Sequence, residues 1–207
     1  MKTLTLRHVL TTLAVASAVV VPMAVQAQAT PWLVRVRALN LDSANKDSTG
    51  LGLTVNNKVI PEVDISYFFS PELAAELVLT YPQKHRISSN GTEIGSLKHL
   101  PPTLSMQYHV QGFGAIKPYA GVGLNYTRFS NVEFIPSIQA ALQPTLKKNS
   151  FGLSVQVGVD YEISKNLYLN LDVKKVQIAT DVSSFGSKVG EFKVNPWLIG
   201  GGVGWRF

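Results

Sequence analysis

Apolar and polar residues alternate with a period of two along most of this chain. In the stretch FGLSVQVGVDY, every second residue from Phe151 to Tyr161 is apolar, and the residues between them are small or polar. This pattern is typical of β-strands with two different faces. Eight segments of this kind follow one another, over residues 31–41, 58–69, 74–82, 98–110, 116–129, 149–163, 167–179 and 191–207.

The connections between these segments alternate in length. Those after the second, fourth and sixth segments are short (SPEL, QGFGA and SKN) and rich in turn-forming residues. The other connections are longer and polar, and the one near 130–148 contains IPSIQAALQPTL, which could form a short helix. Short turns at one end and long loops at the other are typical of outer-membrane barrels.

A soluble β-sandwich or a lipocalin-like barrel would also show alternating strands, with the apolar face turned inward. Three features favour the opposite orientation. The apolar sets are as long as a strand that crosses a bilayer, aromatic residues cluster at strand ends as at membrane interfaces, and charged residues make up only 15% of the chain. We therefore predict an all-β fold, an eight-stranded antiparallel transmembrane β-barrel of the bacterial outer membrane.

The first thirty residues have the pattern of a secretory signal peptide. Lys2 and Arg7 precede an uncharged apolar run, and small residues follow at the spacing of a cleavage site. The run is about 13 residues long, short of the roughly 20 that a membrane-spanning anchor requires. We expect cleavage after Ala27 or Ala29, which makes 1–27 a signal peptide and 28–207 a single barrel domain.

The chain ends on an aromatic residue in an alternating apolar segment. Trp205 and Phe207 lie on the same face as Ile199 and Val203. Such an end is typical of the C-terminal signal that the outer-membrane assembly machinery recognises. The last strand must also pair with the first, because an open sheet edge in hydrocarbon leaves backbone groups without partners. We expect Trp205 and Phe207 to act as the assembly signal, and both termini to be periplasmic.

Five stretches carry a resemblance to a known family: PWLVRVRALNL, LPPTLSMQYHV, KPYAGVGLNYTRF, VGVDYEISKNLYLNLDVKKVQIATDV and VNPWLIGGGVGWRF. Over the whole mature chain, the sequence resembles the OmpW family of small outer-membrane proteins, which includes the AlkL-type importers of alkane degraders. The resemblance implies a narrow lumen open to the outside and the passage of small hydrophobic molecules. It also implies contact with outer-membrane lipids, lipopolysaccharide and the assembly machinery.

Other function classes find little support in the composition. There is no cysteine, and the net charge of +6 is scattered and not gathered on one element, so we expect no nucleic-acid partner. His99 and His109 lie about 33 Å apart at ordinary strand rise, too far to share a metal. His85, interpreted as part of a polar loop, is the only weak candidate for a catalytic site. We predict no enzymatic activity, no metal and no cofactor.

The inward-facing charges are more informative. Arg35 and Arg37 on the first strand should face Glu62 and Asp64 on the second. A similar set on the sixth and seventh strands consists of Asp160, Asp172 and Lys174. The interior of an eight-stranded barrel is only just wide enough for side chains, so these groups favour a structural salt-bridge network that plugs the lumen. A selectivity filter is the alternative.

A plug would force a hydrophobic solute to leave sideways through the wall. Proline interrupts a strand ladder because it has no N–H to donate. Pro101 and Pro102 are the preferred candidates for a lateral exit, ahead of Pro61, whereas Pro118 lies beside a turn, where proline is harmless. The expected apolar lining of the upper lumen consists of Leu39, Val78, Phe129, Phe134 and Ile135.

The sequence as a whole thus predicts a passive outer-membrane channel for small hydrophobic molecules. These would enter between the extracellular loops and leave through the barrel wall. The alternative is a structural or receptor barrel, with adhesion as one role, whose lumen is plugged and which has no transport path.

Overall fold

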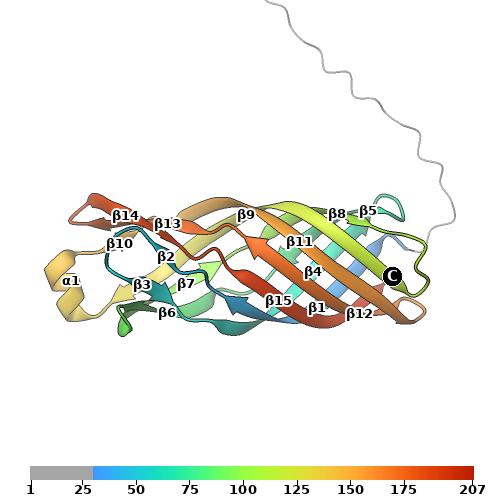
Figure 1. Cartoon of the computed structure of the whole chain (residues 1–207), viewed down its shortest axis with the longest axis horizontal. Helices are drawn as coiled ribbons and strands as arrows, with labels where there is room; N and C mark the ends of the chain where they lie inside the picture. The colour runs from blue at the N-terminus through green and yellow to red at the C-terminus, as the bar shows by residue number, and fades with distance from the viewer. Residues whose placement is uncertain (1–29) are drawn as a thin grey trace, which may run out of the picture.

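The computed structural model describes residues 30–207, so the predicted signal peptide lies outside the described residues. Eight antiparallel strands close into a barrel, which confirms the predicted fold class (Figure 1). Around the barrel these strands are β1 (Trp32–Asp42), β4 (Lys58–Phe68), β5 (Leu73–Leu79), β8 (Thr103–His109), β9 (Ile116–Phe134), β11 (Asn149–Ser164), β12 (Leu167–Val176) and β15 (Trp197–Arg206). Among residues 30–207, no helix is long and apolar enough to span a membrane.

The terminal strands close the barrel. β15 pairs with β1 on one side, from Arg206 opposite Leu33 to Trp197 opposite Asp42, and with β12 on the other. Glycines allow this close approach, since a Cβ at Gly202 would overlap the carbonyl of Val36. Among residues 30–207, each of the eight barrel strands thus has a partner on both sides, as a barrel in hydrocarbon requires.

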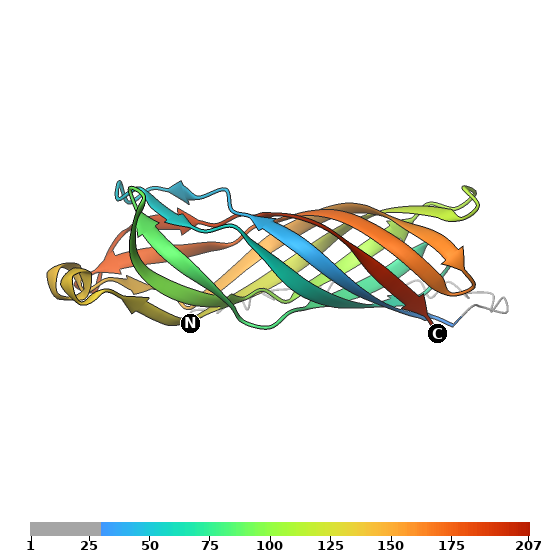
Figure 2. The same cartoon turned by 90° about the horizontal axis from the view of Figure 1, so that it is seen from below.

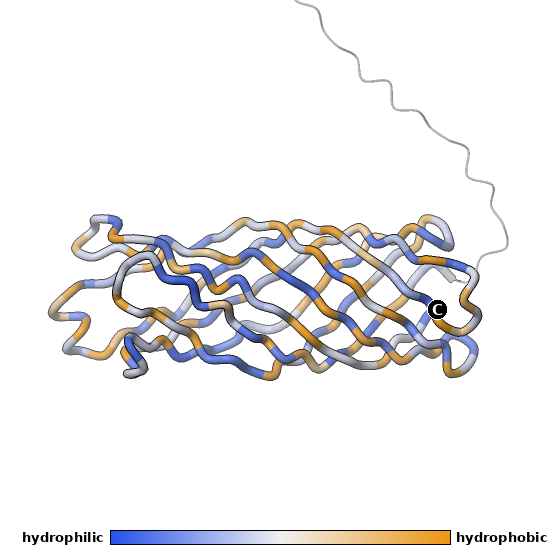
Figure 3. Tube along the Cα trace, viewed as in Figure 1, coloured by the Kyte–Doolittle hydropathy of each residue, from blue (hydrophilic) through white to orange (hydrophobic). Residues whose placement is uncertain are grey.

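The two faces of the strands differ as the alternation predicted. Apolar residues on the outer face are exposed, such as Leu124, Val157 and Leu171, at 66%, 58% and 64%. In Figure 3, hydrophobic and hydrophilic positions alternate along the strands that cross the barrel. An exposed apolar outer face with polar residues inside is the arrangement that a lipid surrounding demands.

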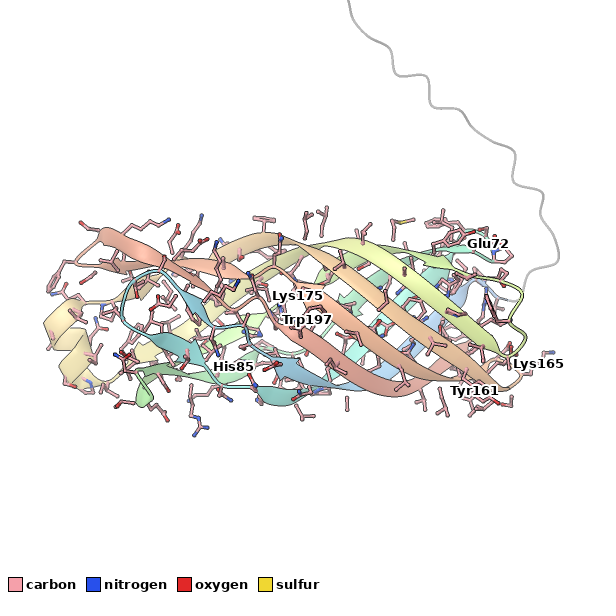
Figure 4. All side chains as sticks on the ribbon, in the orientation of Figure 1. Glu72, His85, Tyr161, Lys165, Lys175 and Trp197 are labelled. Carbon is pink, nitrogen blue, oxygen red and sulfur yellow. The ribbon has the colours of Figure 1, made fainter. Side chains whose placement is uncertain are left out.

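Aromatic side chains mark both ends of this apolar band. At the end with the short turns, Trp32, Tyr67, Tyr161 and Trp205 are exposed. At the other end lie Tyr81, Phe151 and Trp197, which we call the outer girdle. In Figure 4, Tyr161 lies at the short-turn end of the barrel, whereas Trp197 lies near the middle of the long axis. The ammonium of Lys175 lies 4.8 Å from the centre of the Trp197 ring.

Beyond the outer girdle the long connections fold into an extension of the barrel instead of open loops (Figure 2). The strands β3 (Leu53–Val55), β6 (Gln83–Ser89) and β7 (Thr92–Leu100) continue the main sheet. A second sheet joins β10 (Thr145–Leu146), β13 (Ala179–Ser184), β14 (Ser187–Lys193) and β2 (Lys46–Asp47). The helix expected in IPSIQAALQPTL is α1 (Pro136–Leu142), which begins with a proline and ends at Gln143 in the left-handed conformation.

The largest differences from the expected boundaries concern three segments. The fourth segment, 98–110, is two strands, because Pro101 and Pro102 separate β7 from β8. The fifth continues to Phe134, since its far end pairs with β7. The last segment begins at Trp197, and residues 191–193 belong to β14. The expectation of a polar loop around His85 is corrected as well, because His85 is a buried residue of β6.

Candidate functional site

A network of buried charges fills the half of the lumen nearest the short turns. Arg35 and Arg37 occupy successive inward positions of β1, and the register places Asp64 and Glu62 opposite them on β4. Arg35 Nη1 lies 3.0 Å from Asp64, and Arg37 Nη2 lies 2.8 Å from Glu62 and 2.6 Å from Asp64. Both arginines are at most 2% exposed.

The residues expected to form a second set join this same network. Asp160 lies 2.6 Å from Arg35 Nη2, Asp172 lies 3.6 Å from Arg37 Nη1, and Lys174 lies 3.6 Å from Glu62. Closing the barrel brings β11 and β12 across the lumen from β1 and β4. The expectation of two separate sets is therefore corrected to a single network.

Two members of the network were missed in the sequence. Glu76 on β5 lies 3.6 Å from Arg35, 3.4 Å from Arg37 and 3.9 Å from Lys174. The hydroxyl of Tyr119 donates to Asp172 at 2.8 Å. A lone acid within the apolar run LAAELVL was the available signal for Glu76, because an unpaired carboxylate could not occupy such a strand. We call these residues with Arg35, Arg37, Glu62, Asp64, Asp160, Asp172 and Lys174 the lumen charge network.

Beyond the network, toward α1, the lumen becomes apolar. All four long connections line a partly open cavity of about 40 Å³, which we call the upper cavity. Its walls are Leu51, Leu53, Val55, Ile87, Ile94, Leu97, Phe134, Ile138, Leu142, Pro144, Leu146, Val182 and Phe192. The volume corresponds to roughly three water-sized spheres, so a larger solute must displace side chains or loop segments to occupy it.

A second, smaller space lies between the upper cavity and the lumen charge network. This lower cavity of about 20 Å³ is lined on one side by Glu62 and Lys174, and on the other by Pro101, Thr103 and Asn125. It therefore reaches from the top of the charge network to the proline break between β7 and β8.

The strand ladder is interrupted at the level of the lower cavity. Pairing of β5 with β8 ends at Val78 opposite Thr103, and pairing of β6 with β7 starts at Gln83 opposite His99. Pro82 lies on one side of this interruption, and Pro101 and Pro102 lie on the other. None of the three has an N–H, so the gap cannot close with ordinary ladder bonds. Pro82 was not among the prolines expected at the exit.

The side chain of Asn125 closes this gap from β9. Its amide nitrogen donates to the carbonyl oxygens of Pro101 at 3.3 Å and Pro102 at 3.1 Å, and to Thr103 Oγ1 at 2.9 Å. On the outer surface, Thr103 and Asn125 also border an open groove of about 570 Å³ lined by Leu104, Leu124 and Leu153. We call this the outer groove. One layer of side chains thus separates the lower cavity from the lipid-facing surface.

The predicted apolar lining is found only in part. Leu39 and Phe129, each 1% exposed, belong to the buried apolar cluster of the upper lumen, and Phe134 borders the upper cavity. Val78 lines the lower cavity. The assignment of Ile135 was wrong, because its side chain is 41% exposed and lies on the outer surface beside Lys84 and Arg86. Ile135 precedes Pro136 at the start of α1, where the chain turns away from the wall.

Trp205 and Phe207 lie at the short-turn end of the apolar band. They are 65% and 56% exposed, and the amide of Phe207 donates to the carbonyl of Trp32 at 3.0 Å.

The two other prolines considered for the exit lie within paired strands. Pro118, near the start of β9, pairs with Val159 close to the short turn, and Pro61 pairs with Ala38.

Comparison with known proteins agrees with this architecture. A sequence model described as the OmpW family matches residues 23–207. An uncharacterized outer-membrane protein, y4mB of Sinorhizobium fredii, is 40% identical over 88% of this chain and 82% of its own length. Outer membrane protein AlkL of Ectopseudomonas oleovorans is 27% identical over 75% of this chain and 69% of its own.

A solved structure shows the same likeness in three dimensions. The crystal structure of the outer membrane protein OprG from Pseudomonas aeruginosa superimposes with a TM-score of 0.76 and 26% identity. The match covers 86% of this chain and 96% of that protein. The family and its structural neighbours are outer-membrane barrels, and they indicate no enzymatic function.

Proposed function

This chain belongs to the OmpW family, whose sequence model matches residues 23–207, and from that membership we propose that it is a passive channel for small hydrophobic molecules. They enter between the extracellular loops and leave laterally through the barrel wall. The observation that carries the proposal is the succession of upper cavity, lower cavity and outer groove above a lumen filled by charges.

The charge network supports the lateral direction of this path. A hydrophobic molecule that moved on toward the short turns would have to displace Arg35, Arg37 and their carboxylates, which are paired and out of contact with water. Separating such buried pairs costs several kcal/mol. Opening the wall at the gap breaks the side-chain bonds of Asn125 and the backbone bond from the Tyr126 N–H to the carbonyl of Pro102, each of about 1 kcal/mol. The path with the lower free-energy cost therefore leads through the wall at Pro101 and Pro102.

The small size of the cavities favours a second candidate function. Spaces of about 40 and 20 Å³ leave no continuous passage in the closed barrel, as a structural or receptor barrel without a transport path would require. The two functions differ in a direct measurement. Vesicles that contain the barrel should take up n-octane or toluene faster than vesicles without it if the channel function is correct.

Substitution of Asn125 by alanine should speed uptake of n-octane into such vesicles by about fivefold. The reason is that the closed gap then lacks the side-chain bonds to Pro101 and Pro102, and a net hydrogen bond of about 1 kcal/mol corresponds to that factor. Asn149→Ala is the matched control, since Asn149 is exposed on β11 and accepts a bond from Tyr126. Equal rates for both variants would argue against Asn125 as part of the exit.

We place both termini and the short turns in the periplasm, and α1 and the neighbouring strands outside the cell. Trypsin added to intact cells should then cleave near Lys147 and Lys148, because the side chain of Lys147 is 65% exposed beside β10. The turn at Lys165, which Figure 4 places at the opposite end from α1, should stay intact until the cells are permeabilised. Cleavage at Lys165 in intact cells would invert the topology.

The barrel resides in the outer membrane, and we propose three kinds of partner there. Lipids and lipopolysaccharide would contact its apolar band and the cationic groups beside the outer girdle, such as Lys175. Small hydrophobic solutes would occupy the path. The assembly machinery would recognise Trp205 and Phe207, which are exposed on the last strand.

A further inference from the structure

Three polar side chains form one layer of the inner wall between the two cavities. Gln83 and His85 point inward from β6, and His99, paired with Gln83, points inward from β7. Two residues before His99, Leu97 lines the upper cavity, and two residues after it, Pro101 lines the lower one. A solute on the proposed path must therefore pass this polar layer.

The polar layer contains hydrogen-bonding atoms without partners. Gln83, His85 and His99 are 0%, 1% and 0% exposed. Within residues 30–207, no hydrogen bond reaches Gln83 Oε1, His85 Nε2 or either ring nitrogen of His99. Leaving buried polar atoms unpaired is costly, and native structures contain few of them. Three such side chains at one level of the wall, next to the apolar cluster of the upper lumen, indicate a ligand that supplies the missing bonds.

The hydrogen bonds that these side chains do form show which of their donors and acceptors remain free. His85 Nδ1 lies 3.0 Å from the carbonyl oxygen of Asn56, which can only accept, so Nδ1 carries the hydrogen and Nε2 is an acceptor. The amide nitrogen of Gln83 donates to the carbonyl of Tyr81 at 3.1 Å, which leaves Oε1 as an acceptor. A neutral His99 adds one donor and one acceptor. The layer thus offers three free acceptors and two donors, the ring N–H of His99 and the second N–H of the Gln83 amide.

The histidines lie beyond the outer girdle, on strands whose outward residues include Lys84 and Arg86. Burial lowers the pKa of His99 to about 3, and nearby His85 and Lys58 act in the same direction. Burial also lowers the pKa of His85. Both rings are therefore neutral at pH 7 and offer no charge to an anionic solute.

Metal binding does not fit this arrangement. The two rings are stacked, with centroids 4.5 Å apart and planes inclined by 16°, so their lone pairs do not converge on one point. Among residues 30–207, no group of three His, Cys, Asp or Glu side chains could hold a metal ion.

We propose that Gln83, His85 and His99 form a selection site for apolar molecules that carry one hydroxyl or N–H donor, such as alkanols and alkylphenols. The hydroxyl donates to one of the free acceptors and accepts from the ring N–H of His99. Its hydrocarbon part lies against Phe129, whose ring stands edge-on to His99 at 6.4 Å, and in the neighbouring cavity. This inference rests on the proposed channel function and names the class of solute that the channel selects.

Nitrogen NMR of the histidine-labelled barrel in lipid nanodiscs tests the site without any substitution. His85 should have its hydrogen on Nδ1. Addition of 1-octanol should shift the resonances of His85 and His99, whereas n-octane should shift neither. Heptyl methyl ether can accept from His99 but cannot donate, so it should leave His85 unshifted. His109 is the internal control, because it lies in the lower lumen, where its Nε2 is already bonded to Gln107 at 3.1 Å. Equal responses to octanol and octane, or a response of His109 alone, would overturn the proposal.

Uptake into vesicles gives a second, independent measurement. His99→Phe and Gln83→Leu keep the size of the side chain and remove the hydrogen-bonding atoms. Each should lower the rate ratio of 1-octanol to n-octane by about fivefold, the factor that corresponds to one net hydrogen bond. Thr180→Val is the control, since Thr180 is buried but already donates to Lys147 at 2.9 Å. If a folded variant still takes up octane and the rate ratio is unchanged, the selection site is refuted and the channel function stands. If the unmodified barrel takes up neither solute, the channel function itself is refuted.

Discussion

Replacing Pro101 and Pro102 together with alanine is expected to slow uptake of n-octane by about thirtyfold. The two alanines restore the backbone N–H groups that the prolines lack. In a strand, successive N–H groups point to opposite sides, so one new bond can form toward each neighbouring strand. Two bonds of about 1 kcal/mol each favour the closed wall by about 2 kcal/mol, which corresponds to that factor.

The control for this experiment is Pro118→Ala. Pro118 lies in β9 opposite Val159, far from the gap and close to a short turn. The Pro118→Ala substitution should leave the rate of n-octane uptake unchanged. The double variant should remain folded, because the new N–H donors meet carbonyl groups that are already in the wall. Folding is checked by comparing the migration of the barrel on a gel before and after heating. A folded double variant with the uptake rate of the unmodified chain would show that the solute does not leave through the interruption between the β5–β8 and β6–β7 pairings.

Arg35→Ala is expected to destabilise the barrel by about 3–5 kcal/mol, the usual cost of leaving a buried charge without its partner. Arg35 is fully buried and bonded to Asp64 and Asp160, so water cannot replace it. Unfolding in urea from lipid vesicles, followed by the fluorescence of the tryptophans at the two interfaces, measures the change. Uptake of n-octane should change little, because the exit lies above the charge network.

The structure also indicates which second substitution should restore stability. Within residues 30–207, the carboxylate of Asp160 forms an ion pair with Arg35 alone. Arg35→Leu combined with Asp160→Asn removes both charges of this pair, and the amide oxygen can still accept from Asn170, which lies 2.8 Å from Asp160 Oδ1. The double variant should recover a large part of the lost stability.

Neutralising Arg35, Arg37, Glu62 and Asp64 together should recover less, because Glu76, Asp160 and Asp172 would then face Lys174 as their only cation in the network. If Arg35→Ala abolished octane uptake and left stability intact, the charges would lie on the path of the solute. The lateral exit would then be wrong.

Interactions between neighbours along the chain were predictable from the sequence. Period-two alternation separates an outward apolar face from an inward polar one, and short turns make consecutive strands antiparallel neighbours. That was enough to predict eight strands, the helix after residue 135 and the facing of Arg35 and Arg37 toward the acids of β4. These features depend only on the local geometry of a strand and of its neighbour along the chain, and the residue pattern specifies that geometry.

Contacts across the lumen were decided only by closure of the barrel. Asp160 meets Arg35 over a separation of 125 residues, and Gln156 donates to Glu76 over a separation of 80. The β6–β7 hairpin that carries His85 was a local feature that was missed, because its tight turn at Asn90 and Gly91 was interpreted as part of a polar loop and His85 was therefore not recognised as buried. Alternation tells which way a side chain points from its strand, but the side chain that it meets inside depends on the tilt and stagger with which eight strands close.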